Sequence, residues 1–258
     1  MNLYSFDLDG TLLAKHFGKI KQEIYDKINT FIDAGNVVIV NSGRPLEILR
    51  KYMSPIHKSE NFYYSTNNGA ALFKQDGTNI FCKPVLSNML KTLQLENNNL
   101  EIFTYTLEDL LITFKEGDNS RYEAKVNEME TRVVSMDDDL SNYVMLKYVI
   151  CGTKEEIDNI KIDVDRNKYS VIRTKDIMVE IMEISADKVT AIDYLCEKYK
   201  SIDKVYAFGD ADNDASSIKK YFGVTFKNGS SSCKKFAKYV SNKESDEGVL
   251  DAFLSLNL

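Results

Sequence analysis

The chain opens with Leu3-Tyr4-Ser5-Phe6-Asp7-Leu8-Asp9-Gly10-Thr11-Leu12-Leu13, in which a mostly apolar run delivers two carboxylates into a turn that contains glycine. Residues i and i+2 of an extended chain project to the same side, so Asp7 and Asp9 can face a common point beyond the end of this strand. Open α/β sheets bind their ligands at that end. Two neighbouring carboxylates repel each other unless a cation or a shared proton compensates them. The pair therefore predicts a hard divalent metal and a reaction that uses one nucleophilic and one proton-transferring carboxylate.

A calcium loop is the first alternative for this stretch, and a helix-capping turn is the second. The EF-hand template counted from Asp7 requires an acid or amide at its fifth position and Glu at its twelfth. Those positions hold Thr11 and Gly18, so the calcium interpretation fails. The stretch 209–214, Gly-Asp-Ala-Asp-Asn-Asp, also imitates a calcium loop and fails the same template, because Ala215 and Tyr221 occupy its sixth and twelfth positions.

Composition narrows the class of protein. The chain has 258 residues, of which 43% are hydrophobic and 28% charged, as is typical of a soluble globular protein with one large or two smaller domains. The net charge of −6 argues against nucleic acid as a partner, because binding a phosphate backbone requires a basic surface. No apolar run approaches the ~18 residues of a membrane span, and the N-terminus does not resemble a signal peptide. We expect a cytoplasmic protein without a membrane partner.

The cysteines and histidines offer little metal or nucleophile chemistry. Cys82, Cys151, Cys196 and Cys233 lie far apart in the sequence, and each is in or near an apolar run. We expect them to be reduced and mostly buried. The only histidines are His16 and His57, so a zinc site or a Cys–His nucleophile is not expected.

Strand, turn and helix alternate over both ends of the chain. The run Val37-Val38-Ile39-Val40 is short, apolar and β-branched, as in strands that are buried on both faces of a parallel sheet. The apolar spacing of residues 20–34 and 188–200 predicts amphipathic helices. Further helices are predicted over 46–53, 231–238 and 246–256, further strands over 62–65, 205–208 and 223–226, and a short hairpin over 72–82.

The pattern changes between residues 83 and 185. Helices are predicted over 85–97 and 154–162, and strands over 101–105, 110–114, 143–151, 169–172 and 178–184. Alternation in the last of these strands predicts an antiparallel sheet with one exposed face. The intervening stretch, which includes Asp137-Asp138-Asp139, is polar and is interpreted as a solvated loop. We interpret 83–185 as a separate α+β module inserted into an α/β core.

Polar groups lie at four places in the predicted core, namely Asp7 with Asp9, Ser42, Lys188 at its helix start, and Asp210 with Asp214. Ser42 follows the second strand, where it can bind a phosphate oxygen or serve as a helix N-cap. Lys188 stands at a helix start, which disfavours a cation unless an anion is near. Asn68 lies in an Asn-Gly turn. Asp210 and Asp214 follow the strand over 205–208, and Asn213 or Asp214 can cap the next helix.

In their joint order, these groups resemble the motifs of the haloacid dehalogenase superfamily of phosphotransferases. D-x-D-G-T-L-L at 7–13 matches the first motif, Ser42 in S-G-R-P the second, Lys188 the third, and G-D-x-x-N-D at 209–214 the fourth. The insertion resembles the C2 cap of the Cof-like branch. The resemblance implies an α/β fold in which a Rossmann-like parallel-sheet core, residues 1–82 and 186–258, carries an inserted α+β cap domain, residues 83–185.

The resemblance also implies a role for each residue. Asp7 would attack phosphorus to give an aspartyl-phosphate, and Asp9 would act as general acid and then as general base. Mg²⁺ would be held by Asp7, the backbone carbonyl of Asp9 and Asp210, with Asp214 as a ligand or as a support. The remaining implied residues bind the substrate phosphate (Ser42, Gly43, Arg44, Asn68 and Lys188) or support the site (Asn213 and Asn228).

The implied function is Mg²⁺-dependent hydrolysis of small phosphorylated metabolites, namely sugar phosphates or a phosphorylated cofactor, by a monomer or small homo-oligomer. Two enzyme alternatives are a phosphomutase and a phosphatase dedicated to one sugar phosphate, and a third is an inactive regulator that binds metal and phosphate. The sequence departs from the family at Val189, where glycine is common, at Lys227 in the 226–230 loop, and at Ser216-Ser217. These departures bear on substrate preference, since they remove no catalytic group.

Overall fold

The computed structural model describes residues 1–14 and 18–258, and His16 lies outside them. The chain divides into two compact units, each described here by itself. The core unit comprises residues 1–81 and 187–258, and the inserted unit comprises residues 82–186. The division differs by one residue at each end from the insertion predicted over 83–185.

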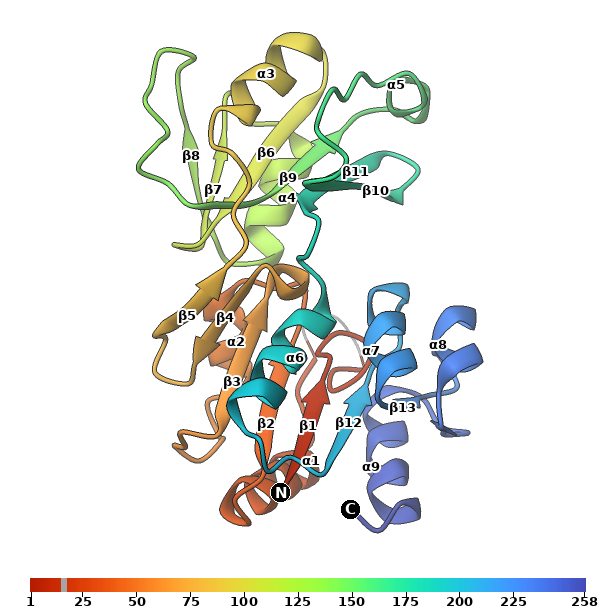
Figure 1. Cartoon of the computed structure of the whole chain (residues 1–258). Helices are drawn as coiled ribbons and strands as arrows, with labels where there is room; N and C mark the ends of the chain where they lie inside the picture. Colours follow the sequence, from red (N-terminus) through yellow and green to blue (C-terminus); the bar gives the residue numbers. More distant parts are fainter. Residues whose placement is uncertain (15–17) are drawn as a thin grey trace. The chain divides into compact units, whose positions relative to one another are not determined.

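The core unit contains an eight-stranded sheet with the order β14-β13-β12-β1-β2-β3-β4-β5 (Figure 1). Its strands are β1 (Asn2–Phe6), β2 (Val37–Asn41), β3 (Phe62–Thr66), β4 (Ala71–Lys74), β5 (Asn79–Cys82), β12 (Lys204–Phe208), β13 (Phe222–Thr225) and β14 (Tyr239–Val240). The six strands from β14 to β3 in this order are parallel, whereas β4 is antiparallel to β3. The carboxyl ends of β1, β2, β3 and β12 therefore meet at one edge. The predicted α/β class with a parallel core is confirmed.

Helices cover both faces of this sheet. Their bounds are α1 (Gln22–Asp33), α2 (Leu46–Tyr52), α6 (Lys188–Lys198), α7 (Ala215–Lys220), α8 (Ser231–Phe236) and α9 (Ser245–Ser255), with short 3₁₀ turns η1 (Asn67–Gly69) and η2 (Asp212–Asp214). Side chains alternate between the two faces along β1. Leu3 belongs to an apolar cluster with Leu195 of α6, while the Tyr4 ring stacks on the Phe31 ring of α1 with centroids 3.9 Å apart. Phe6 meets Phe253 of α9 edge to face. β1 is thus buried on both faces, so its contribution to the site comes from the residues at its carboxyl end.

The inserted unit is built on a six-stranded sheet with the order β10-β11-β9-β6-β7-β8. Its strands are β6 (Glu101–Thr106), β7 (Leu110–Thr113), β8 (Glu130–Val133), β9 (Met145–Cys151), β10 (Tyr169–Lys175) and β11 (Met178–Glu183). Its helices are α3 (Met89–Glu96), α4 (Asp118–Val126) and α5 (Lys154–Asp158). All the pairs are antiparallel except β7 with β8.

The expectation of one exposed sheet face is wrong. Met178 and Met182 are both buried, although they alternate with Val179 and Ile181 along β11. Met178 belongs to a second apolar cluster that includes Ala124 of α4. Helix α4 and strand β8 are not among the predicted elements. The sequence of α4 (Asp-Asn-Ser-Arg-Tyr-Glu-Ala-Lys-Val) contains too few apolar residues to show a helical pattern.

Two predicted helices are shorter than expected. The one predicted over 85–97 begins at Met89, because the Val85 amide donates to the Met145 carbonyl and holds this residue in an extended bridge. The one predicted over 154–162 ends at Asp158. Beyond it, the Lys161 amide donates to the Asn97 side chain instead of continuing the helix.

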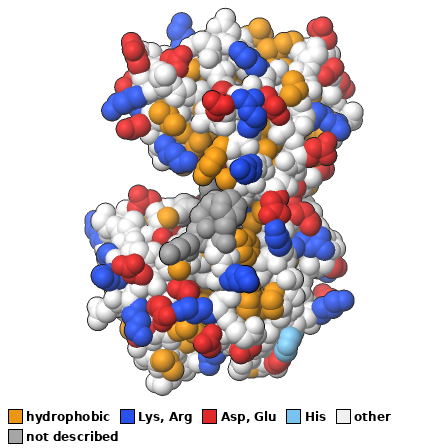
Figure 2. Space-filling model, turned by 180° about the vertical axis from the view of Figure 1, so that it is seen from behind, with side chains coloured by type: hydrophobic (Ala, Val, Ile, Leu, Met, Phe, Trp, Pro, Cys, Tyr) orange, Lys and Arg blue, Asp and Glu red, His pale blue; other side chains and the backbone are white. Residues whose placement is uncertain are grey.

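The described surface mixes the two signs of charge. On the face shown in Figure 2, Lys and Arg side chains are interspersed with Asp and Glu side chains. Among the described helices, none combines the length and the apolar character needed to cross a membrane. All four cysteines are free thiols; Cys151 and Cys233 are buried, whereas Cys82 and Cys196 are only partly buried.

Candidate active site

Asp7 and Asp9 leave β1 at the edge where the parallel strands end. The Asp7 amide donates to the Phe208 carbonyl of the neighbouring strand, which fixes its backbone. Asp7 is 6% exposed, whereas Asp9 is half-buried. The chain then turns back, because the Leu13 amide donates to the Leu8 carbonyl at 2.8 Å. This loop presents Asp7 inward and Asp9 outward.

Lys188 is the buried cation beside Asp7. Its Nζ donates to Oδ1 of Asp7 and to Oδ1 of Asp214, each at 2.6 Å. Burial alone would lower the pKa of Lys188, but the charges of Asp214 and Asp7 outweigh it and raise the pKa. The two carboxylates explain why a lysine is stable at the start of α6, where the helix dipole opposes positive charge.

Asp214 is held by both of its oxygens. Oδ2 accepts from the Asp210 and Ala211 amides, each at 3.0 Å, and Oδ1 accepts from Lys188. The side chain therefore closes the loop after β12 and makes no capping bond to α7, contrary to the capping alternative. A Cβ on Gly209 would lie 2.4 Å from Cγ of Asp214, so this close approach requires glycine.

Asp210 is the third carboxylate of the cluster. Its Oδ1 accepts from Thr11 Oγ1 at 3.1 Å, and its Oδ2 accepts from Asn228 Nδ2 at 3.3 Å. Burial and the charge of Asp214 raise the pKa of Asp210 to about 6. Burial also raises the pKa of Asp7 well above its ordinary value, although the charge of Lys188 acts in the opposite direction.

The donor set fits a hard divalent cation. One oxygen from each of Asp7, Asp210 and Asp214 lies within 4.8 Å of the other two. Three carboxylates share one ammonium, and burial, which disfavours the charged form, is the main cause that raises the pKa values of Asp7 and Asp210. Carboxylate oxygens are the ligands that Mg²⁺ prefers. Both oxygens of Asp214 accept hydrogen bonds from Lys188 and two backbone amides, and both oxygens of Asp210 accept from the side chains of Thr11 and Asn228.

Ser42, Gly43 and Arg44 follow β2 at the same edge. Ser42 is buried, and its Oγ accepts from the Arg44 amide at 3.2 Å. It is not the N-cap of α2, since Pro45 occupies that position. The guanidinium of Arg44 forms a two-point ion pair with Asp9. The family resemblance implies that Arg44 binds the substrate phosphate; in the structure its guanidinium contacts Asp9.

Asn68, Asn213 and Asn228 hold the surrounding loops together. Asn68 has a left-handed backbone with φ of 56°, and its Oδ1 accepts from Asn213 Nδ2 at 2.9 Å. A Cβ on Gly43 would lie 3.0 Å from the same Oδ1. Asn228 donates to the Gly10 carbonyl and accepts from the Ser245 amide at the start of α9. Asn68 therefore joins the second and fourth motif loops, and Asn228 braces the first.

Three further residues of the site were not singled out from the sequence. Thr11 donates to Asp210, and Asn41 donates to the Lys188 carbonyl at 2.7 Å. Asp187 caps α6 by accepting from the Val189 amide. A polar residue that ends a wholly apolar strand was the available signal for Asn41, and the threonine of the first motif was the signal for Thr11.

Comparisons with known proteins find similar sequences over almost the whole chain. The sequence model of a family described as haloacid dehalogenase-like hydrolase matches residues 4–253. A Streptococcus pyogenes protein named "Putative phosphatase M6_Spy0533" is 22% identical over 98% of this chain and 97% of its own. The Bacillus subtilis protein "Putative phosphatase YxeH" is 22% identical over 99% of this chain and 98% of its own.

A solved structure shows the same fold. It is the crystal structure of a haloacid dehalogenase-like hydrolase from Bacteroides thetaiotaomicron, with a TM-score of 0.82 and 23% sequence identity, and the match covers 99% of both chains.

Proposed function

The chain belongs to the haloacid dehalogenase-like hydrolases, and we propose that within this family it is a Mg²⁺-dependent phosphomonoester hydrolase that works through an aspartyl-phosphate. The observation that carries the proposal is the position of Asp7. Its carboxylate is buried, is held by Lys188, and belongs to a cluster with Asp210 and Asp214, while Asp9 stands two residues away. A nucleophile, a proton-transfer group and a cation-binding set thus meet at one sheet edge.

The metal site would be formed by Asp7, the backbone carbonyl of Asp9 and Asp210, with Asp214 as support. When bound, Mg²⁺ neutralises the charge of the phosphoryl group and of the carboxylates around it. The chain's own contribution is a fixed frame: Thr11 and Asn228 orient Asp210, and the amides of residues 210 and 211 orient Asp214.

In the first step, a carboxylate oxygen of Asp7 attacks phosphorus as the bond from phosphorus to the leaving oxygen breaks. Asp9 donates its proton to that oxygen, so the product leaves as an alcohol and Asp9 becomes a carboxylate. Asp7 is then an acyl phosphate. Splitting one displacement into two in this way requires that the nucleophile stay fixed, as the bond from Lys188 ensures.

In the second step, a water oxygen attacks the phosphorus of the acyl phosphate and Asp9 takes the water proton. The bond between phosphorus and Asp7 breaks, which restores the Asp7 carboxylate and releases inorganic phosphate. The sum of both steps is ester plus water giving alcohol plus phosphate. Lys188 and Ser42 would hold the phosphoryl oxygens throughout, since Lys188 reaches Asp7 from the start of α6 and Ser42 follows β2 at the same sheet edge.

The proposed substrates are small phosphorylated metabolites, such as sugar phosphates or a phosphorylated cofactor. The test is phosphate release from a panel of such compounds with Mg²⁺, with EDTA, and with the Asp7→Asn variant. We expect release that needs the metal and falls by at least about 10³-fold in Asp7→Asn, because that variant lacks the nucleophile. Asp212→Asn is the matched control, because Asp212 is an exposed carboxylate of the same loop as Asp214.

Absence of release from every compound by the folded, Mg²⁺-bound protein would contradict the proposal. Conversion of one phosphate isomer into another without net release would identify a phosphomutase instead. Calorimetric titration with Mg²⁺ separates binding from turnover: we expect Asp210→Asn to weaken Mg²⁺ binding by about 10- to 100-fold, and Asp212→Asn to leave it unchanged.

A further inference from the structure

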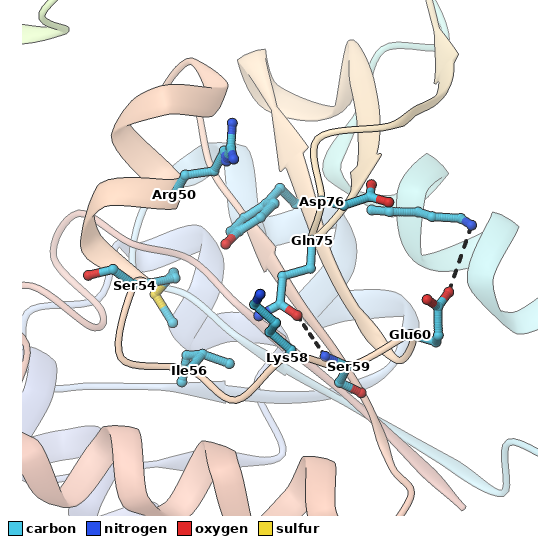
Figure 3. Close-up of a pocket in the computed structure, with 11 residues that line it drawn as sticks. Arg50, Ser54, Ile56, Lys58, Ser59, Glu60, Gln75 and Asp76 are labelled. Carbon is cyan, nitrogen blue, oxygen red and sulfur yellow. Dashed lines mark hydrogen bonds and ion pairs between the residues drawn. The ribbon is translucent and has the colours of Figure 1, made fainter.

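A second pocket lies in the core unit, and it shares no lining residue with the site described above. Its volume is about 640 Å³, within the range of small-molecule sites. Its walls come from the end of α2, the chain over residues 53–60, strand β3 and the turn after β4 (Figure 3). No activity proposed so far uses this pocket.

Buried apolar groups line part of the pocket. Met53 and Ile56 are 1% and 6% exposed, and Tyr64 of β3 is 3% exposed. The Tyr64 ring is fixed by an edge-to-face contact with Phe62, with centroids 5.1 Å apart. These three side chains offer a compact apolar surface to the body of a ligand.

The Tyr64 hydroxyl is a polar group without a partner. Within residues 1–14 and 18–258, no donor or acceptor makes a hydrogen bond with it, although the side chain is almost completely buried. The hydroxyl oxygen itself is not sealed from solvent, so it can donate a hydrogen bond to a ligand atom in the pocket. Burial raises the pKa of Tyr64 to about 12, so the hydroxyl is a donor at physiological pH.

The pocket lining holds the cations Arg50, Lys58 and Lys74 and the carboxylates Glu60 and Asp76. Arg50 pairs with Glu47 at 2.8 Å, and Lys74 pairs with Glu60 at 3.8 Å. In the part of the chain that the structure describes, no carboxylate forms an ion pair with Lys58. Lys58 is therefore the lining cation that is available to an anion.

The wall that carries Lys58 is held in place by Gln75. The Oε1 of Gln75 accepts from the Ser59 amide at 2.7 Å (Figure 3). Its Nε2 donates to the His57 carbonyl at 3.0 Å. On the other side, the His57 amide donates to Asn29 Oδ1 at 2.8 Å. Both neighbours of Lys58 are thus anchored, and a preformed wall lowers the entropic cost of binding.

We propose that this pocket binds a small organic anion. The apolar body of the anion lies on Met53, Ile56 and the Tyr64 ring. One of its acceptor atoms accepts a hydrogen bond from the Tyr64 hydroxyl, and its acidic group pairs with Lys58. The acidic group is a carboxylate or a phosphoryl-type group, since both accept from an ammonium. This site is independent of the phosphatase proposal, because none of its residues contacts the Asp7 cluster.

Probe molecules test the site on the full chain. Benzoate and phenylphosphonate carry the two candidate acidic groups on an aromatic ring. Benzyl alcohol and benzylammonium are neutral and cationic compounds with the same ring, and inorganic phosphate lacks the apolar body. With benzoate or phenylphosphonate, we expect amide NMR shifts over residues 53–60, 64 and 74–76. The other three probes should bind at least about 5-fold more weakly. The relative affinity of the two anions identifies the preferred acidic group.

Two variants then locate the contacts. Tyr64→Phe removes only the hydroxyl and Lys58→Gln removes only the charge, so each is expected to weaken the better anion by about 3- to 10-fold. Lys238→Gln is the matched control on an exposed lysine outside the pocket, and we expect no change. Absent shifts at these residues, equal binding of all five probes, or full affinity in both folded variants would overturn the proposal.

Discussion

Arg44 holds both carboxylate oxygens of Asp9: its Nε lies 2.8 Å from Oδ2 and its Nη2 lies 2.8 Å from Oδ1. A guanidinium fork that matches a carboxylate in this way fixes orientation as well as charge. In the proposed mechanism Asp9 moves a proton in each step, so one of its oxygens must be released from Arg44 when substrate binds. We therefore propose that Arg44 positions Asp9.

Arg44→Lys is expected to lower kcat for phosphate release by about 10-fold with a smaller change in KM. A lysine keeps the charge but lacks the second donor of the fork, so Asp9 is oriented less well while phosphate binding by Ser42 and Lys188 is retained. Steady-state kinetics on the best substrate of the panel measure this. Arg121→Lys is the control, because Arg121 is in an exposed ion pair of the inserted unit. An unchanged kcat would show that the fork does not position Asp9.

Lys188→Met is expected to lower the free energy of unfolding by about 3–5 kcal/mol in EDTA, because Asp7 and Asp214 then remain buried without their cation. Urea titration measures the loss. In the Asp7→Asn background the same substitution should cost less, since one of the two charges is gone. Mg²⁺ should also reduce the loss. An equal loss in both backgrounds would mean that the carboxylates are not what Lys188 compensates.

Much of the core could be predicted from the sequence, because the apolar runs there are the segments that the fold buries. Val37–Val40 is a strand in the structure as its β-branched run predicts, and it is buried along its whole length. The strand-end positions of Asp7, Ser42 and Asp210 follow from the same pattern, because parallel strands bring their carboxyl ends to one edge. The membership of the chain in the haloacid dehalogenase-like hydrolases, expected from these motifs, is confirmed.

The partners of the site residues were not predictable in the same way. Arg44 and Asp9 are 35 residues apart, and nothing local distinguishes an arginine that binds phosphate from one that binds a carboxylate. Helix α4 was missed because its stability comes from tertiary contacts and from the Glu101 carboxylate at its N-terminus, not from an apolar pattern.

Gly10→Ala is expected to disrupt Mg²⁺ binding while leaving the fold intact. Gly10 has φ of +85°, and a Cβ there would lie 2.3 Å from Oδ2 of Asp210, so the carboxylate must move. Gly35→Ala is the matched control, because Gly35 has φ of +78° with nothing within 4 Å of the added Cβ. Both variants should lose about 1–2 kcal/mol of stability from the left-handed backbone. Only Gly10→Ala should weaken Mg²⁺ binding, by about 10-fold or more in calorimetry; equal affinities would contradict the clash.

Glu101→Gln is expected to destabilise the protein at neutral pH and to have less effect in acid. The Glu101 carboxylate accepts from the Ser120 amide at 2.6 Å and from the Asn119 amide at 3.1 Å, at the start of α4. Burial alone would raise the pKa of Glu101, but the hydrogen bonds from Ser120 and Asn119 outweigh it and lower the pKa from 4.5. A carboxyl whose pKa is lower in the folded state contributes its full stability above the unfolded pKa and loses it as the pH falls through the folded pKa. Urea titrations should therefore show a loss of about 1–2 kcal/mol at pH 7 that shrinks below about pH 4. The exposed Glu96→Gln should show neither the loss nor its pH dependence, and a pH-independent loss in Glu101→Gln would show that packing, not charge, holds α4.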